Sequence, residues 1–226
     1  MDAKKIVVAY EGGRIVVLDI KEPNGRLISS LNLKTKLLGM CCSPNSNDVY
    51  ILTTHSELYK WSIKENRQRM IFSNKEQHAS CIVAIPDKRQ AAVCFSNGNI
   101  EFMDMTTDTK ADAMLGGHAE FQEAIYDTKT GYLMISSLDK RITVIKTRSI
   151  AEKPVVIEEH SLNRSNILSI GLASNNTIYA LTEDNEIRYF NLDIEANVAE
   201  INKQMPPPLK QEELELILGR DFLNNL

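Results

Sequence analysis

Five short segments of the chain superpose on one another without gaps, and this repeat limits the possible folds more than any other feature of the sequence. The sixth residue of each segment forms an apolar column that contains Trp61, the sole tryptophan. The segments are GRIVVLDI from Gly13, SELYKWSI from Ser56, GNIEFMDM from Gly98, KRITVIKT from Lys140 and NEIRYFNL from Asn185. The column is Leu18, Trp61, Met103, Ile145 and Phe190, at spacings of 43, 42, 42 and 45 residues. A period of this size indicates supersecondary units stacked side by side.

Each unit has the pattern of several β-strands. Apolar and polar residues alternate, β-branched and aromatic residues recur, and short polar turns separate the runs. A second apolar run precedes each segment across a tight turn, such as the one at Asn97-Gly98. In four units a third run comes before these two, and a weaker run follows the segment. We therefore predict four antiparallel strands per unit, an arrangement that describes one blade of a β-propeller.

Two stretches resemble the motifs of WD40 repeats. Residues 136–146, SSLDKRITVIK, are similar to the end of such a repeat, and residues 116–118, GGH, resemble the Gly-His pair that opens one. The resemblance covers roughly residues 4–201 and implies an all-β, WD40-like β-propeller with about five units. It also implies that the apolar column anchors the blades, and that His118, Asp139 and Ser136 or Ser137 form a hydrogen-bonded network within one blade.

The expected domain boundaries follow the repeat. We assign residues 1–203 to the propeller and residues 204–226 to a proline-rich connector with a C-terminal helix. The propeller units are expected at residues 4–35, 36–77, 78–117, 118–159 and 160–203. In the tail, Pro206-Pro207-Pro208 cannot continue a strand ladder, and the sequence beyond it is rich in helix formers. Its apolar stripe, which would dock on the propeller or on a partner, includes Leu214, Leu218 and Phe222. The alternation of Leu214, Leu216 and Leu218 leaves a closing strand over residues 213–219 as the alternative.

Closure of the ring presents a difficulty. The first unit begins directly with KKIVVAY, so its innermost strand is missing. Propellers of the WD40 type usually close by pairing strands from the two chain ends, which leaves no open edge. Three explanations are open: the units belong to a larger propeller, a partner protein donates the strand, or the tail supplies it.

The sequence gives no pattern for a metal or cofactor site. His78, His118 and His160 recur near the start of three units, but equivalent positions on successive blades do not converge on one ion. The cysteines Cys41, Cys42, Cys81 and Cys94 have neither a zinc spacing nor a C-x-x-C motif, and we expect buried, reduced thiols. We therefore expect no cofactor and no metal.

Catalysis and direct nucleic-acid binding are both disfavoured. No nucleophile elbow, H-E-x-x-H, P-loop or G-x-G-x-x-G motif occurs. A small propeller hydrolase would need polar residues lining its axis, whereas the predicted innermost strands are almost wholly apolar. The net charge is −4 and the basic residues are interleaved with acidic ones, which is untypical of a nucleic-acid groove. A subunit of an RNA- or DNA-processing complex with direct contact to nucleic acid is the alternative function.

These patterns predict a non-enzymatic scaffold that binds other proteins as a subunit of a multiprotein complex. The N-terminal residues lack a signal-peptide core, and no apolar run approaches about 18 residues, so we expect an intracellular protein, cytoplasmic or nuclear, without membrane insertion. The resemblance implies that the hairpin turns form the partner-binding face. The candidate contact residues there are His55, Ser56, Asn97, Asp139, Lys140, Glu183 and Asp184.

Overall fold

The fold is described from a computed structural model. The residues that the structure describes are 4–21, 24–44, 47–115, 119–147, 155–161, 165–173 and 177–191. The predicted tail helix, the alternative closing strand and the side chains of Leu214, Leu218 and Phe222 lie outside these ranges. Residues 1–190 form one compact unit, which holds the strands described below except for Asn191, the last residue of the final strand.

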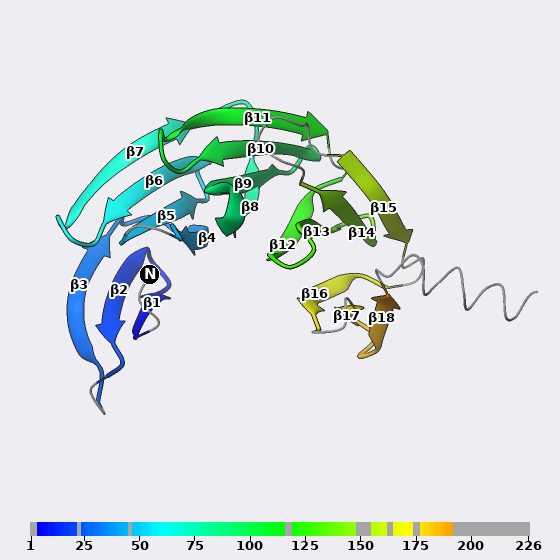
Figure 1. Cartoon of the computed structure of the whole chain (residues 1–226), viewed down its shortest axis with the longest axis horizontal. Coiled ribbons are helices and arrows are strands. Elements are labelled where there is room, and N and C mark those ends of the chain that lie inside the picture. Colours follow the sequence, from blue (N-terminus) through cyan, green and yellow to red (C-terminus); the bar gives the residue numbers. More distant parts are fainter. Residues whose placement is uncertain are drawn as a thin grey trace, which may run out of the picture. The chain divides into compact units, whose positions relative to one another are not determined.

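Eighteen strands form five antiparallel sheets in the described part of the chain, and Figure 1 labels them in chain order. Sheet 1 comprises β1 (Lys5–Ala9), β2 (Arg14–Asp19) and β3 (Arg26–Asn32). Sheet 2 comprises β4 (Leu37–Cys42), β5 (Asp48–Thr53), β6 (Glu57–Ser62) and β7 (Arg67–Ser73). Sheet 3 comprises β8 (Ala79–Ile85), β9 (Gln90–Phe95), β10 (Asn99–Asp104) and β11 (Thr109–Leu115), with the 3-10 turn η1 (Pro86–Lys88) between β8 and β9. Sheet 4 comprises β12 (Phe121–Asp127), β13 (Tyr132–Ser137), β14 (Arg141–Lys146) and β15 (Val155–Ser161). Sheet 5 comprises β16 (Ile167–Leu172), β17 (Thr177–Thr182) and β18 (Ile187–Asn191).

The strands follow one another within each sheet as the repeat predicts. Neighbours in the chain are neighbours in the sheet, so each unit is a simple up-and-down ladder. Among the described residues, sheet 1 has three strands and no strand that pairs with β1 on its inner side, as expected from its first residues. The fourth predicted boundary, at residues 159 and 160, falls inside a strand, because β15 continues to Ser161. His160 therefore lies in the last strand of sheet 4, not in a loop that opens the fifth unit.

The sheets also share their irregularities. In sheets 2 to 5 the register between the first two strands shifts near the start of the first strand. The shifts lie between Leu37 and Gly39, Ala79 and Cys81, Phe121 and Glu123, and Ile167 and Ser169. A bulge of this kind increases the local twist of a sheet. Its recurrence at one position shows that the units repeat in backbone geometry as well as in sequence.

Apolar layers between consecutive sheets form the core. One layer joins Ile15 and Val17 of sheet 1 to Val49, Ile51 and Trp61 of sheet 2. Two further layers join sheet 2 to sheet 3 and sheet 3 to sheet 4 in the same way. The first strands β4, β8, β12 and β16 contact one another in that order. The sheets inside this series are therefore apolar on both sides and are stabilised mainly by the sheets before and after them in the chain.

The anchor column lies in these layers. Trp61, Met103 and Ile145 are buried, each against the sheet that precedes it in the chain, and Leu18 and Phe190 are half-buried. Trp61 is 0% exposed, and its indole Nε1 donates a hydrogen bond of 3.3 Å to Oδ1 of Asn66 in the β6–β7 turn. A buried indole N–H needs such a partner.

The four cysteines are free thiols. Cys81 and Cys94 are buried between sheets 3 and 4, whereas Cys41 and Cys42 are half-buried on β4. A hydrogen bond with Cys81, together with burial, raises the pKa of the Cys94 thiol. A protonated, buried thiol is a poor nucleophile and a poor metal ligand, so Cys94 serves in packing.

Candidate protein-interaction surface

Each unit has one hairpin turn between its second and third strand positions, and the five turns share one backbone feature, although the turn of sheet 1 differs at Gly12, whose φ is also positive (87°). In each, the first residue of the repeated segment has a positive φ, and its amide donates to the carbonyl three residues earlier at 3.0–3.2 Å. These residues are Gly13 (φ 87°), Ser56 (58°), Gly98 (83°), Lys140 (67°) and Asn185 (62°). Left-handed backbone after a type I turn closes three-residue hairpins. At Gly13 the residue must be glycine, because a Cβ would lie 2.1 Å from the carbonyl oxygen of Thr35.

Two of these turns are closed by a hydroxyl group and a carboxylate. Ser137 donates to Asp139 in sheet 4, and Thr182 donates to Asp184 in sheet 5 at 2.5 Å. The hydrogen bond from Thr182 and other donors lower the pKa of Asp184, so its carboxylate stays ionised. The same hydroxyls contact the carbonyls of Arg141 and Glu186 at 3.3 and 3.0 Å. The turns are thus held by their own side chains and present fixed charges to solvent.

The turns at the opposite ends of the strands carry a second recurring contact, in which an Asn or Asp reaches back to the preceding sheet. Asn66 and Asp108 each lie five residues after an anchor and have a positive φ, 48° and 57°. Asn66 binds Ser29 of β3 at 2.8 Å, and Asp108 binds Arg69 of β7. Ser29 and Arg69 are equivalent, because each pairs with the residue immediately before an anchor. We call this contact the turn latch; sequence analysis missed it, although Asn or Asp at a fixed offset was a visible signal.

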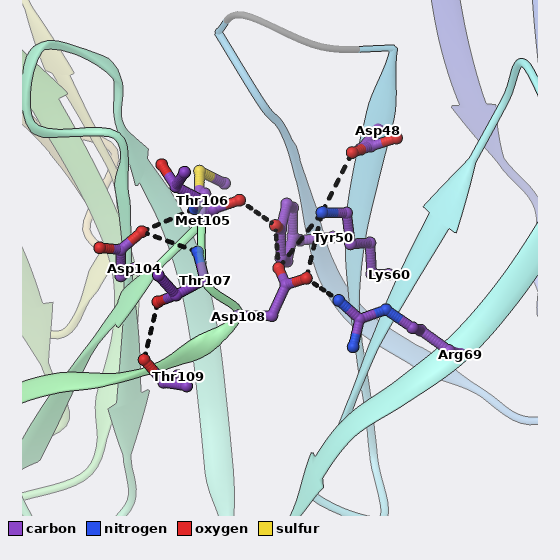
Figure 2. A network of polar contacts seen from close by, with 10 residues as sticks. All are labelled: Asp48, Tyr50, Lys60, Arg69, Asp104, Met105, Thr106, Thr107, Asp108 and Thr109. Carbon is purple, nitrogen blue, oxygen red and sulfur yellow. Dashed lines mark hydrogen bonds and ion pairs between the residues drawn. The ribbon is translucent and has the colours of Figure 1, made fainter.

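Asp108 is the centre of the larger latch (Figure 2). Its side chain is 3% exposed and accepts from the Tyr50 hydroxyl at 2.5 Å and from Lys60 Nζ at 3.1 Å. Lys60 also pairs with Asp48 at 3.1 Å, and the Tyr50 hydroxyl contacts the carbonyl of Met105 at 2.8 Å. A buried carboxylate with this many donors is satisfied. The network therefore fixes the β10–β11 turn of sheet 3 to sheet 2.

Comparison with solved structures agrees with this architecture. The β-propeller domain of Cps50 (Swd1) from Myceliophteria thermophila superposes with a TM-score of 0.75 over 83% of this chain, at 11% sequence identity. The C-terminal WD40 domain of Sif2 superposes with a TM-score of 0.70 over 84% of this chain, at 14% identity. The fold is that of a WD40 β-propeller. The prediction made from the repeat is therefore confirmed.

A computationally designed protein, Ika8, also superposes, with a TM-score of 0.68 over 85% of this chain at 12% identity. This chain spans 65% of the Swd1 domain, 57% of Ika8 and 52% of the Sif2 domain. No protein-family model and no curated protein sequence matches the chain. The likeness thus lies in the WD40 fold and not in a close sequence relationship.

Most of the predicted contact residues in the hairpin turns lie at the surface. His55, Asn97, Glu183 and Asp184 are exposed, and Asp139 and Lys140 are half-buried. Ser56 is 1% exposed, because its left-handed backbone turns the hydroxyl inward to accept from the amide of Ala79 at 2.8 Å. The hydroxyl of Ser56 therefore links two blades, and its burial does not favour the predicted partner contact at this residue.

The predicted blade network is placed in part. Asp139 bonds to Ser137, whereas the hydroxyl of Ser136 lies 3.5 Å from the carbonyl oxygen of Glu123. Of the two serines first considered, Ser137 is thus the one that holds Asp139. His118 lies outside the described residues, so its membership of the network stays a prediction.

We call the side of the molecule that carries these hairpin turns the turn side. On this side, two connections of sheet 2 line one hollow. The β5–β6 turn contributes His55, the β7–β8 connection contributes His78, and the two histidines are exposed. The volume of the hollow is 360 Å³. Its lining is Thr54, His55, Ser56, Glu57, Ser73, Asn74, Lys75 and His78. All of these lining residues carry polar side chains, which offer both hydrogen-bond donors and acceptors and leave much of the hollow open to solvent; such a surface suits a peptide or protein partner better than an apolar ligand.

Cations gather in another hollow, of 440 Å³, at the opposite ends of the strands of sheet 2. It is lined by Lys60, Arg67 and Arg69 among others. Lys60 pairs with Asp48 and Asp108, and Arg69 pairs with Asp108, so two of these three cations are already neutralised. A phosphate backbone would have to compete with those carboxylates. The hollow therefore gives little support to nucleic-acid binding.

A third hollow, of 650 Å³, lies beside the outer strands of sheets 2 and 3 and includes Phe72 and Met103 in its lining. Within the described ranges, no three His, Cys, Asp or Glu side chains come close enough together to hold a metal ion. No helix in the same ranges is long and apolar enough to cross a membrane. The turn-side hollow, which is lined by the predicted contact residue His55, thus remains the candidate interaction surface.

Alkaline pH is expected to destabilise the WD40 fold through Tyr50. Burial, then the nearby carboxylate of Asp48, raise the pKa of Tyr50 above its ordinary value. In the unfolded chain tyrosine ionises near pH 10. Because the folded pKa is the higher one, the stabilisation is present below about pH 10 and is lost as pH rises above it. Urea unfolding between pH 8 and 11 should show a fall in the free energy of unfolding that is smaller in Tyr50→Phe, with Tyr189→Phe, at an exposed position, as the control. An unchanged alkaline slope in Tyr50→Phe would contradict this assignment.

Proposed function

We propose that this chain is a non-enzymatic WD40 scaffold that binds other proteins through its turn side, as an intracellular subunit of a multiprotein complex. The observation that carries the proposal is the polar hollow where His55 and His78 meet, on a surface whose backbone is fixed by repeated hydrogen bonds. A rigid surface loses little conformational entropy when a partner binds. The WD40 fold is commonly used in this way, which supports the proposal by analogy.

The charges on the same side support a protein partner. Asp139, Lys140, Glu183 and Asp184 lie in the hairpin turns, and Lys75 lies in the β7–β8 connection on the same side. Mixed charge fixes the orientation of a protein partner and raises its association rate. A scaffold of this kind needs no catalytic group, and the inward-facing side chains serve packing.

The test compares a turn-side variant with a matched variant from the opposite strand ends. The triple substitution His55→Ala, Lys75→Ala and His78→Ala removes three side chains from the hollow. The control, Lys64→Ala, Glu65→Ala and Gln68→Ala, removes three exposed side chains from the β6–β7 turn and the start of β7. All three proteins are tagged, expressed in full in the native cell and purified by affinity, and co-purifying proteins are quantified by mass spectrometry.

We expect the turn-side variant to lose at least about tenfold of one or more specific partners, since hot-spot residues at interfaces contribute about 2 kcal/mol or more. The control should retain them, and both variants should keep the circular dichroism spectrum of the wild type. Equal recovery of every partner by the wild type and the turn-side variant would refute the proposed use of this surface.

A further inference from the structure

The face of sheet 5 that points away from sheet 4 is apolar and exposed, although the same face is buried in the other sheets. The residue three positions before the anchor is Ile15, Leu58, Ile100 or Ile142 in sheets 1 to 4, and each is 0% exposed. The equivalent residue in sheet 5, Ile187, is 68% exposed. In a monomeric protein such a reversal at one position of a repeat needs an explanation.

The neighbouring positions behave in the same way. One residue before the anchor, Val17, Phe102 and Val144 are buried, whereas Tyr189 is 73% exposed. On the adjoining strand β17, Tyr179 and Leu181 are exposed, while their equivalents in sheet 2, Tyr50 and Leu52, are buried. We call Tyr179, Leu181, Ile187 and Tyr189 the forward face of sheet 5.

The other sheets show what covers a forward face. The forward face of sheet 1 packs on Val49, Ile51 and Trp61 of sheet 2. That of sheet 2 packs on Ala91, Val93 and Met103 of sheet 3, and that of sheet 3 packs on Leu133, Ile135 and Ile145 of sheet 4. In every case the cover is the second and third strand of another antiparallel sheet, with apolar residues at alternate positions. The face of sheet 5 that is exposed in the described part of the chain is thus of the same kind as the covered faces at three interfaces inside the molecule.

The cover also supplies a polar group. Tyr50, on the forward face of sheet 2, donates its hydroxyl to Asp108, the residue of sheet 3 that forms the turn latch. Tyr179 occupies the position of Tyr50 in sheet 5, so its hydroxyl needs an equivalent acceptor once it is covered, because a buried donor without a partner is costly. A suitable cover therefore carries Asn or Asp in the turn that follows its third strand.

A second copy of this chain fits these requirements poorly. The sheet that it could offer is sheet 1, whose corresponding face exposes Ile6, Ile20 and Leu27. The turn after β2 is longer than those after β6 and β10, and the left-handed residue directly before β3, in the place of Asn66 and Asp108, is Gly25 (φ 64°), which has no acceptor side chain. An apolar contact would form, but the latch would not.

We propose that the forward face of sheet 5 docks a different protein, which presents an antiparallel β-sheet with alternating apolar residues on two adjacent strands and an Asn or Asp in the turn after them. The docked sheet extends the stack of blades by the packing already present between sheets 1 to 4. It buries the two tyrosines, the leucine and the isoleucine that are now exposed to water. This interface does not depend on the use of the turn side proposed above.

The test places a photo-crosslinking amino acid, p-benzoylphenylalanine, at Tyr189 of the full chain in its native cell, with the same amino acid at the exposed Met70 as the control site. Crosslinked peptides are identified by mass spectrometry, and a mixture of isotope-labelled and unlabelled copies distinguishes contacts within and between copies. We expect Tyr189 to crosslink to a β-strand of another protein whose apolar residues alternate. A crosslink to a peptide of this same polypeptide, to a helical segment of another protein, or no crosslink above the Met70 site overturns the proposal.

Charge substitution supplies the quantitative arm. Ile187→Asp with Tyr189→Asp should lower recovery of the crosslinked protein by at least about tenfold, whereas the control pair Gln68→Asp with Met70→Asp, at exposed positions on β7, should not. Equal recovery with both pairs overturns the proposal. The turn-side variant should leave the Tyr189 crosslink in place, so the two interfaces are tested separately.

Discussion

Replacing Trp61 with Ala should lower the free energy of unfolding by about 3–5 kcal/mol, the usual cost of removing a large buried aromatic side chain. The indole is 0% exposed and fills the layer between sheets 1 and 2, against Ile15, Val17 and Val49. The sheets on either side are held apart by their own hydrogen-bonded ladders, so the cavity can collapse only in part. The substitution also leaves Asn66 without the indole N–H.

Chemical denaturation followed by far-ultraviolet circular dichroism measures this effect. Trp61→Phe keeps most of the volume and removes the N–H, so it should cost clearly less than Trp61→Ala. Met70→Ala, at an exposed position on β7, is the surface control and should change stability by less than about 0.5 kcal/mol. A loss below about 1 kcal/mol in Trp61→Ala would show that the anchor column does not hold the blades together.

The anchor column was predictable because a strand period of two and a blade period near 42 residues leave little freedom. Alternation places Trp61, Met103 and Ile145 on one face of the third strand, and the repeat places those faces at equivalent positions in successive sheets. The left-handed residue that opens each segment was also within reach of the alignment. Gly98 signals it by residue type, whereas Lys140 adopts it only because the rest of the hairpin requires it.

Contacts that cross from one blade to the next were harder to predict. The offset of five residues from the anchor to Asn66 and Asp108 is visible in the sequence, but their partners Ser29 and Arg69 lie 37 and 39 residues away. Only the packing of one sheet on another brings such residues together. Ser56 was assigned to the surface for a similar reason, since the sequence does not tell that its hydroxyl turns back to the next blade.

The choice between Ser136 and Ser137 illustrates the limit of pattern analysis within one strand. The two residues are adjacent and lie on opposite faces, so only one can face the turn carboxylate of Asp139. The register of β13 with β14 decides in favour of Ser137, the last residue of the strand. Thr182 and Asp184 repeat the same pair in sheet 5, a likeness that the alignment of the five segments already contained.

Replacing Asp108 with Asn should cost about 1–3 kcal/mol of stability, the range for removing one charged partner from a buried hydrogen bond. Asn tolerates the left-handed backbone at this position, where φ is 57°, so the loss reports on the carboxylate and not on the turn. Lys60 keeps its pairing with Asp48, and Arg69 is more than half exposed and remains solvated, which is why a larger loss is not expected.

A double-mutant cycle with Tyr50→Phe separates the latch from general effects of charge. Because the Tyr50 hydroxyl donates to Asp108 at 2.5 Å, the two substitutions should be non-additive, with a coupling energy of about 0.5–3 kcal/mol. Asp112→Asn, on the same strand–turn–strand unit but partly exposed, is the matched control and should combine additively with Tyr50→Phe. Additivity of Asp108→Asn with Tyr50→Phe would mean that the hydrogen bond between the Tyr50 hydroxyl and Asp108 does not contribute to joining sheets 2 and 3.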